Sequence, residues 1–217
     1  MAPHDLCPIC NKRRAERYCP AKGEKICSVD CGTGREVTID CPSDCGYLLA
    51  AHQWEQAHPK SIAQRELPFP DVSFAASLVH THQALLSGIG YTVAAFAHEQ
   101  ASTNDADVFS AAQAIAETYR TLASGIYFEK IPEGLVAAGL YAALAKFLDE
   151  EKQREGDDPR AAKPKDSEIF HLLVFFLRFG ILRSNSRPRT RMFLQFLREQ
   201  MPPEMGAAKQ ESRIILP

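Results

Sequence analysis

The chain has 217 residues, of which 45% are hydrophobic and 24% charged, and its formal net charge is −2. This length allows one ordinary domain plus a small satellite module, and the apolar content supports a buried core of the kind found in soluble globular proteins. The sequence pI of about 6.4 counts against a dedicated nucleic-acid-binding domain, because such domains are usually basic.

The N-terminus does not have the pattern of a signal peptide. Residues Met1–Lys12 are polar, and two cysteines stand where a signal peptide needs an apolar core. The strongest apolar run, Ile169–Leu182, is about 14 residues long and contains a histidine and an arginine, so it suits a buried helix rather than a membrane span. We therefore expect a cytoplasmic protein without a membrane anchor.

All seven cysteines lie in the first fifth of the chain. Their order is Cys7-x2-Cys10, Cys19, Cys27-x3-Cys31 and Cys41-x3-Cys45. A Cys-x2-Cys pair lets two thiolates on one turn approach the same metal ion, and an x3 pair places two sulfurs on one face of a helical turn. An odd number of cysteines without a secretion signal argues against a disulfide scaffold. The spacing predicts a zinc-binding module over residues 1–58, with a short strand at Glu36–Asp40.

This segment resembles the zinc fingers of the HIT and MYND type, through Cys7-x2-Cys10, Arg17-Tyr-Cys-Pro20 and Ile26-Cys-Ser-Val-Asp-Cys31. Those fingers are cross-braced, treble-clef-like units that hold two zinc ions and mostly serve in protein interactions, so the resemblance implies the same fold and role here. It also implies one site made of four cysteines: Cys7, Cys10, Cys27 and Cys31. The chain departs from the pattern at Lys22, which replaces a cysteine, and at Cys41, which replaces a histidine.

Three cysteines then remain for a second site that lacks one ligand: Cys19, Cys41 and Cys45. The first candidate for the missing ligand is His52, which lies on the same helix face as Cys45 but about 10.5 Å further along the axis. It reaches the metal only if the helix breaks between Gly46 and Ala51. The alternatives are His58 and His4. We expect one or two Zn²⁺ ions in a structural role, because no His-x-Glu motif of the kind that a zinc deaminase needs precedes the cysteines.

Beyond a linker at residues 59–70, apolar periodicity predicts an all-α bundle of about five helices over residues 71–200. Gly88 and Gly90 predict a kink or a close helix crossing in the first of these helices. The five expected helices run from an N-cap at Asp71 through Phe96, over 106–123, from Pro132 to about 151, over 169–182 and over 192–200. A charged, mobile linker is expected at 153–165 and a tail at 201–217.

The best anion-binding candidate lies between the last two helices. Five arginines occur there within 14 residues without one acidic residue: Arg178, Arg183, Arg187, Arg189 and Arg191. The arginine guanidinium suits phosphate or carboxylate, and the loop leads into a helix N-terminus that favours anions. The other interpretation is internal pairing with the middle helices, since residues 61–160 hold 14 acidic residues against 7 basic ones.

No Gly-rich phosphate loop, nucleophile motif or paired carboxylates occur in the helical part. We therefore predict a zinc-binding adaptor or regulatory protein that acts through protein–protein interaction. One alternative is a nucleic-acid-binding protein that uses the Arg183–Arg191 loop. The other is an enzyme with a pocket in the helical bundle near four scattered histidines: His80, His82, His98 and His171.

Overall fold

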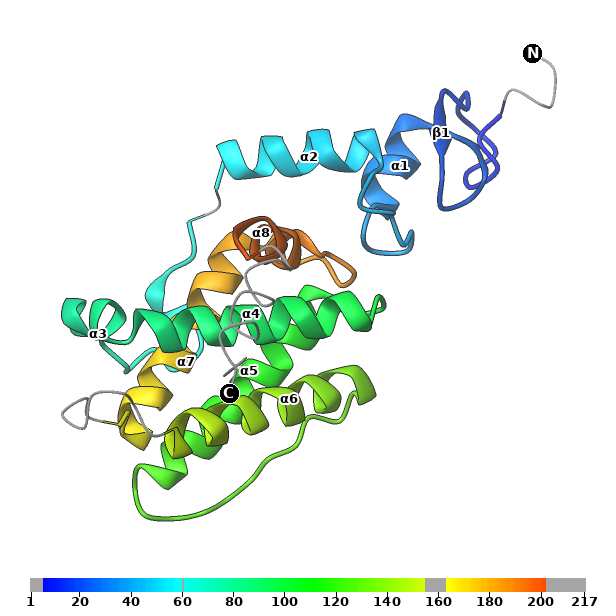
Figure 1. Cartoon of the computed structure of the whole chain (residues 1–217). Coiled ribbons are helices and arrows are strands. Elements are labelled where there is room, and N and C mark those ends of the chain that lie inside the picture. Colours follow the sequence, from blue (N-terminus) through cyan, green and yellow to red (C-terminus); the bar gives the residue numbers. More distant parts are fainter. Residues whose placement is uncertain (1–5, 60, 155–162, 202–217) are drawn as a thin grey trace, which may run out of the picture.

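A computed structural model describes residues 6–59, 61–154 and 163–201. These residues form eight α-helices and one two-stranded sheet, which confirms the prediction of a largely helical protein (Figure 1). The elements in chain order are β1 Arg17–Cys19, β2 Glu24–Ile26, α1 Ser28–Gly34, α2 Gly46–Ala57, α3 Ala76–Thr81, α4 Gln83–Glu99, α5 Asp105–Leu122, α6 Leu135–Gln153, α7 Asp166–Arg183 and α8 Met192–Gln200. None of these helices is both long enough and apolar enough to cross a membrane.

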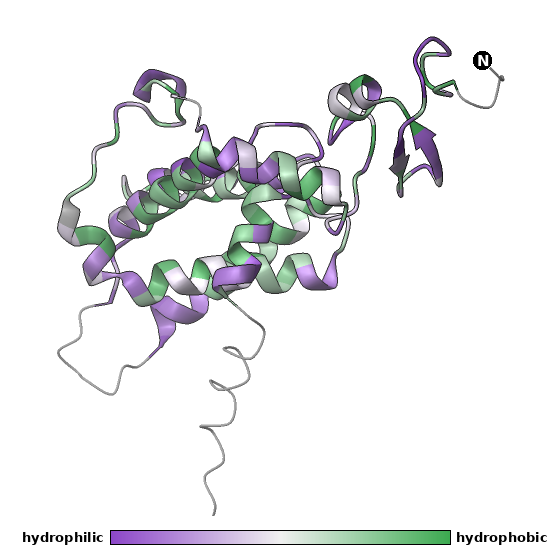
Figure 2. Ribbon diagram, turned by 90° about the horizontal axis from the view of Figure 1, so that it is seen from above, coloured by the Kyte–Doolittle hydropathy of each residue, from purple (hydrophilic) through white to green (hydrophobic). Residues whose placement is uncertain are grey.

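The cysteine-rich segment forms a small unit, which we call the N-terminal module (residues 6–58). It extends beyond one end of the bundle, with α2 leading back toward it (Figure 1). Strands β1 and β2 pair antiparallel, with Cys19 opposite Glu24. The residues of these strands are mostly hydrophilic, whereas the bundle helices are largely hydrophobic (Figure 2). Apart from cysteines, its described buried apolar side chains are Ile26, Ile39 and Leu48, which is too little apolar surface to stabilise an isolated fold.

Helices α5 and α7 pack together at the centre of the bundle, and α4, α6 and α8 surround them. Apolar residues at helical spacing explain this arrangement, because each helix presents a buried stripe to its neighbours. The crossing of α7 with its neighbours is close at Gly180, where a Cβ atom would lie 2.7 Å from the Phe109 ring and 2.8 Å from the Phe193 ring. Phe193 of α8 is fully buried and packs against Phe176 and Phe179 of α7.

Several predicted boundaries hold, and others are wrong. The predicted second, fourth and fifth helices correspond to α5, α7 and α8. The first predicted helix is in fact two helices, α3 and α4, separated at His82. The described part of residues 71–200 therefore contains six α-helices rather than about five. Helix α4 continues through Gly88 without a break, and Gly88 instead makes a close crossing in which a Cβ atom would collide with the Phe147 ring of α6. The third predicted helix begins at Leu135 and not at Pro132.

The N-cap predicted at Asp71 is also wrong, because the segment before α3 is held by a distant side chain. Arg178 of α7 is buried, and its guanidinium donates hydrogen bonds to the carbonyl oxygens of Pro68, Phe69 and Val72. This contact holds a segment of bends and a turn, in which Phe69 has a φ of 55°, and α3 begins only at Ala76. Most of the predicted mobile linker (155–162) and nearly all of the predicted tail (202–217) lie outside the described residues.

Candidate metal centre

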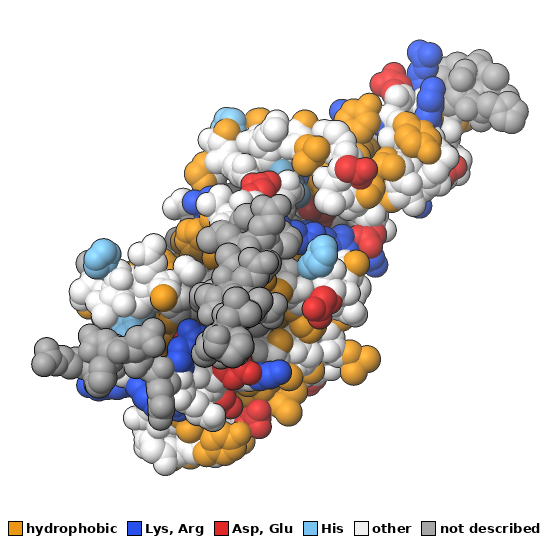
Figure 3. Space-filling view, viewed as in Figure 1, with side chains coloured by type: hydrophobic (Ala, Val, Ile, Leu, Met, Phe, Trp, Pro, Cys, Tyr) orange, Lys and Arg blue, Asp and Glu red, His pale blue; other side chains and the backbone are white. Residues whose placement is uncertain are grey.

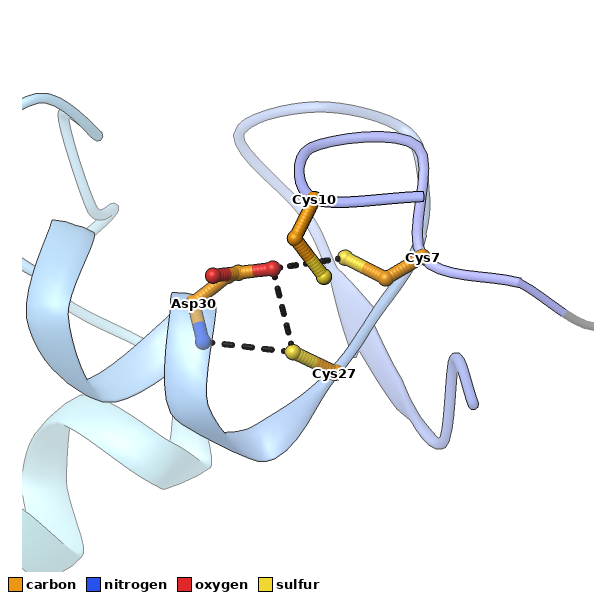
Figure 4. Close-up of side chains that lie close together, drawn as sticks. All are labelled: Cys7, Cys10, Cys27 and Asp30. Atoms are coloured by element: carbon orange, nitrogen blue, oxygen red, sulfur yellow. Dashed lines mark hydrogen bonds between the residues drawn. The ribbon is translucent and has the colours of Figure 1, made fainter. Parts of the chain in front are cut away.

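Four potential metal ligands of the N-terminal module point toward one another (Figure 4). Cys7 and Cys10 come from a tight turn that Asn11 closes at a φ of 51°, with its N–H donating to the Cys7 carbonyl oxygen at 2.8 Å. Cys27 caps the N-terminus of α1, and Asp30 lies in its first turn. One ligand atom from each of these residues lies within 4.8 Å of all the others, which permits them to hold a metal ion.

Hydrogen bonds connect this cluster through the Asp30 carboxylate. The Cys7 and Cys27 thiols donate to Asp30 Oδ2 at 3.0 and 3.1 Å. Hydrogen bonds from the Cys10, Cys7 and Cys27 thiols hold the pKa of Asp30 at about 2. Burial raises the pKa of the Cys27 thiol. Three thiolates and a carboxylate this close would repel one another without a cation, whereas three sulfurs and one oxygen suit tetrahedral coordination of a divalent metal.

Asp30 occupies the place in this cluster at which Cys31 was expected. The expectation treated Cys27 and Cys31 as two residues of one helical turn, but Cys27 is the N-cap residue, with an extended backbone (φ −77°, ψ 159°). The side chain of an N-cap residue faces the third residue of the helix, not the fourth. Accordingly, the Asp30 N–H donates to Cys27 Sγ at 3.3 Å, and Asp30 completes the cluster.

The other cysteines lie together elsewhere in the N-terminal module. The three cysteines predicted for a second site all line one small cavity, and Cys31 lines the same cavity. The four thiols that line this cavity belong to Cys19, Cys31, Cys41 and Cys45. In the part of the chain that the structure describes, only the first cluster has three or more ligand atoms within 4.8 Å of one another.

Neither of the two candidate histidines that the structure describes is placed as a metal ligand. Helix α2 runs unbroken from Gly46 to Ala57, so the break that would bring His52 to the cysteines does not occur. His52 is buried and its Nε2 lies 3.0 Å from Glu36 Oε1. His58 Nδ1 lies 2.8 Å from the Trp54 carbonyl oxygen, and its ring stacks on Trp54 at 4.5 Å. His4 lies outside the described residues.

The arginine loop between α7 and α8 binds the N-terminal module rather than the acidic middle helices. The Arg187 guanidinium donates to the carbonyl oxygens of Gly32 and Arg35 at 3.2 and 2.7 Å. The Arg191 guanidinium donates to Asp40 Oδ1 at 2.8 Å and to the Thr103 carbonyl oxygen at 3.1 Å. Two of the four arginines in the Arg183–Arg191 loop are therefore engaged inside the molecule, as is the fifth arginine of the predicted group, Arg178.

The other two arginines of the loop are exposed. The Arg183 guanidinium lies over the Phe179 and Phe196 rings, 5.0 and 4.5 Å from their centroids. The Arg189 backbone N–H donates to the Glu36 carbonyl oxygen at 2.9 Å. The loop is thus held at several points against α7, α8 and the module, although Arg183 and Arg189 are exposed.

Glu36 is one of the residues that join the module to the bundle, and sequence analysis missed it. It is 2% exposed. Its φ is 53°, because residues 36–38 form a turn and not the predicted strand. Its carboxylate accepts hydrogen bonds from His52 and, at 2.9 Å, from Asn185 Nδ2. Burial alone would raise the pKa of Glu36. The hydrogen bonds from His52 and Asn185 outweigh burial, so the pKa of Glu36 lies below its usual value. No spacing rule relates positions 36 and 185, so the sequence carries no signal for this contact.

The histidines of the bundle do not form a site. The metal-ligand group that the described residues contain does not include His80, His82, His98 or His171. His82 Nε2 lies 3.8 Å from Glu168, whose carboxylate also accepts the Lys165 N–H at the start of α7.

Comparisons with family models, with curated proteins and with solved structures found no match for this chain.

Proposed function

We propose that this protein is an adaptor that binds a protein partner through exposed apolar side chains, and that Zn²⁺ stabilises its N-terminal module. The distribution of exposed large apolar side chains supports this proposal most directly. Twelve such residues occur in the described chain. Six lie in the N-terminal module: Ile9, Tyr18, Val29, Val37, Tyr47 and Trp54. Five lie in or beside the α5–α6 loop: Ile126, Tyr127, Phe128, Ile131 and Leu135. The twelfth is Leu182.

The two most exposed of these side chains lie in or beside the α5–α6 loop (residues 123–134). This loop runs along the lower edge of the molecule in Figures 1 and 3, where apolar side chains are visible. Tyr127 is 72% exposed and Leu135 is 92% exposed, which costs free energy in water unless a partner covers them.

A groove of about 470 Å³ lies between Ile131 and α6, and it has an apolar floor and a mostly acidic rim. The floor includes Tyr141 and three alanines of α6, and the rim includes Glu129, Asp149 and Glu150. This chemistry favours a partner segment whose apolar side chains are flanked by basic ones, because complementary charge steers and orients association.

Zn²⁺ is the metal that suits the first cluster best. Thiolate ligands select zinc over magnesium or calcium, and a closed set of four protein ligands is typical of structural sites. Strands of three residues and a helix of seven residues are too short to be stable alone, so metal binding would contribute free energy of folding directly. The resemblance to HIT- and MYND-type fingers supports the same assignment.

The experiment places a photo-crosslinking amino acid at Tyr127, at Trp54 and, as a control, at the exposed polar position Ser124. The zinc-loaded full chain is expressed in its own cells and irradiated. We expect defined crosslinked protein adducts from the first two positions and none from the third. The adduct at Tyr127 should disappear when Ile131→Glu is added and persist when Ser124→Glu is added. An equal set of adducts at all three positions, or none, would overturn the adaptor proposal.

The nucleic-acid alternative rests on the exposed guanidinium groups of Arg183 and Arg189. We disfavour it because Arg187 and Arg191 already donate to the N-terminal module. Titration of labelled DNA and RNA at low and moderate salt decides between the two. Binding that weakens with salt and is lost in Arg183→Ala/Arg189→Ala would favour the alternative, since phosphate contacts release counterions.

A further inference from the structure

A cavity lies where the N-terminal module meets the bundle. Its volume is about 410 Å³, which is within the range of small-molecule sites. Helix α2 of the module lines one side and α8 of the bundle lines the other (Figure 1). The α8 side carries three polar side chains at helical spacing: Arg191, Gln195 and Arg198. None of the four residues of the first cluster lines this cavity, so it is separate from the candidate metal centre.

His52 is a buried polar residue of the cavity lining. It is 5% exposed, and its Nδ1 has no hydrogen-bond partner among the described residues. Its Nε2 lies 3.0 Å from Glu36 Oε1. The pKa of Glu36 lies below its usual value, so this carboxylate is ionised and accepts the proton that Nε2 carries. The Nδ1 of the neutral ring is therefore an acceptor that lacks a donor, and a ligand in the cavity can supply one.

Two guanidinium groups on the α8 side offer donors to an anionic group. Arg191 donates from Nε to the Thr103 carbonyl oxygen and from Nη1 to Asp40 Oδ1. Arg198 donates from Nη2 to the Ala97 carbonyl oxygen at 2.7 Å. The remaining N–H groups of both side chains make no hydrogen bond to a described residue. Because the existing contacts already fix both guanidinium groups, a carboxylate can bind them with little further loss of side-chain entropy.

The charges of the lining restrict the kind of anion. Three carboxyl groups line the cavity beside the two guanidinium groups: Glu36, Asp44 and Glu199. A polyanion such as a nucleotide would meet these carboxylates and be repelled. A ligand with one carboxylate and one ammonium group matches charges of both signs. Leu48, which is buried, also lines the cavity and gives a ligand side chain an apolar surface to pack on.

We propose that this cavity binds a small zwitterion of the α-amino acid class. Its carboxylate accepts hydrogen bonds from Arg191 and Arg198, and its ammonium group donates to His52 Nδ1. The ligand would contact both the module and the bundle, and its binding would therefore strengthen the contact between them. This site goes beyond the adaptor function and does not depend on it.

The test is isothermal titration calorimetry of the full-length protein, purified with zinc. The ligands are the common L-amino acids except histidine and cysteine, which bind zinc themselves. We expect at least one of them to bind one per chain, with a Kd below about 1 mM. For the tightest ligand, the matching 2-hydroxy acid lacks the ammonium group and the matching amine lacks the carboxylate. Each should bind at least about tenfold more weakly, because each loses a charge-assisted hydrogen bond.

Two variants with matched controls locate the site. Arg198→Ala should weaken binding by about tenfold or more, whereas Arg183→Ala, at an exposed arginine outside the cavity, should not. Ser43→Trp fills the cavity from an exposed position of its lining and should abolish binding, whereas Ser124→Trp should not. The helical circular dichroism of the bundle verifies that each variant is folded, and hydrogen exchange should slow in both α2 and α8 when the ligand binds.

Three results would each overturn the site. They are no binding by any of these amino acids at about 10 mM, equal binding of the hydroxy acid or the amine, and equal effects of the cavity variants and their controls. None of these results changes the partner crosslinking, so failure of this site and failure of the adaptor function are distinguishable.

Discussion

Asp105 should make the stability of the bundle depend on pH in an unusual direction. It is 0% exposed at the start of α5, and its carboxylate accepts hydrogen bonds from Ser184 Oγ and from the N–H groups of Phe193 and Leu194, at 2.9, 2.9 and 3.1 Å. It therefore caps α8 from a different helix. Burial raises the pKa of Asp105 to about 6, although the hydrogen bonds from the two backbone N–H groups oppose this.

The magnitude follows from linkage. The pKa of about 6 in the folded protein exceeds the usual value of 3.8 by roughly two pKa units. One pKa unit corresponds to about 1.4 kcal/mol, so protonation of Asp105 contributes about 3 kcal/mol to the free energy of unfolding. The folded state holds this proton more tightly than the unfolded state. The contribution is therefore fully present below the unfolded pKa of 3.8 and is lost as the pH rises through about 6.

Urea unfolding of wild type and Asp105→Asn at several pH values between 4 and 7 measures this effect, because the amide keeps the shape but cannot titrate. The unfolding free energy of wild type minus that of the variant should fall by about 2 kcal/mol across this range, because part of the full effect is reached only below pH 4. Glu133→Gln is a matched control, since Glu133 is exposed. The subtraction cancels other titrating groups and the metal site. A difference that is constant, or that grows with pH, would refute the reasoning.

Three further predictions concern packing, the module interface and the metal. Gly88→Ala should lower the unfolding free energy by about 1–3 kcal/mol, because an aromatic ring of α6 occupies the space of the new Cβ, whereas Gly32→Ala has open space and should be near neutral by the same urea assay. Asn185→Ala should cost about 1–3 kcal/mol and increase hydrogen exchange in the N-terminal module, since it removes a hydrogen bond from buried Glu36; unchanged exchange would contradict this role of the interface. Chelation should shift the fluorescence of Trp54, the only tryptophan, while most of the helical circular dichroism persists; simultaneous loss of both signals would show that module and bundle unfold together.

Elements with strong local signals were predictable from the sequence. Asn104 accepts the N–H groups of Ala106 and Asp107, so the start of α5 depends on residues within one helical turn. The cysteine spacing likewise identified metal-ligating residue types, because a tight turn such as Cys7-x2-Cys10 brings its own two sulfurs together.

Tertiary contacts decided the remaining features, because the groups that determine them lie far apart in the chain. Arg178 holds the carbonyl oxygen of Pro68 across 110 residues, and this contact delays the start of α3. Asn185 reaches Glu36 across 149 residues, and this contact places the N-terminal module against the bundle. The sequence by itself identified the cysteines as metal-binding residue types and placed most helices, since both depend on neighbours in the chain. Which potential ligands lie close together, and which arginines are exposed, depended on the orientation of side chains in the folded protein, since burial and capping set that orientation only after the segments have packed together.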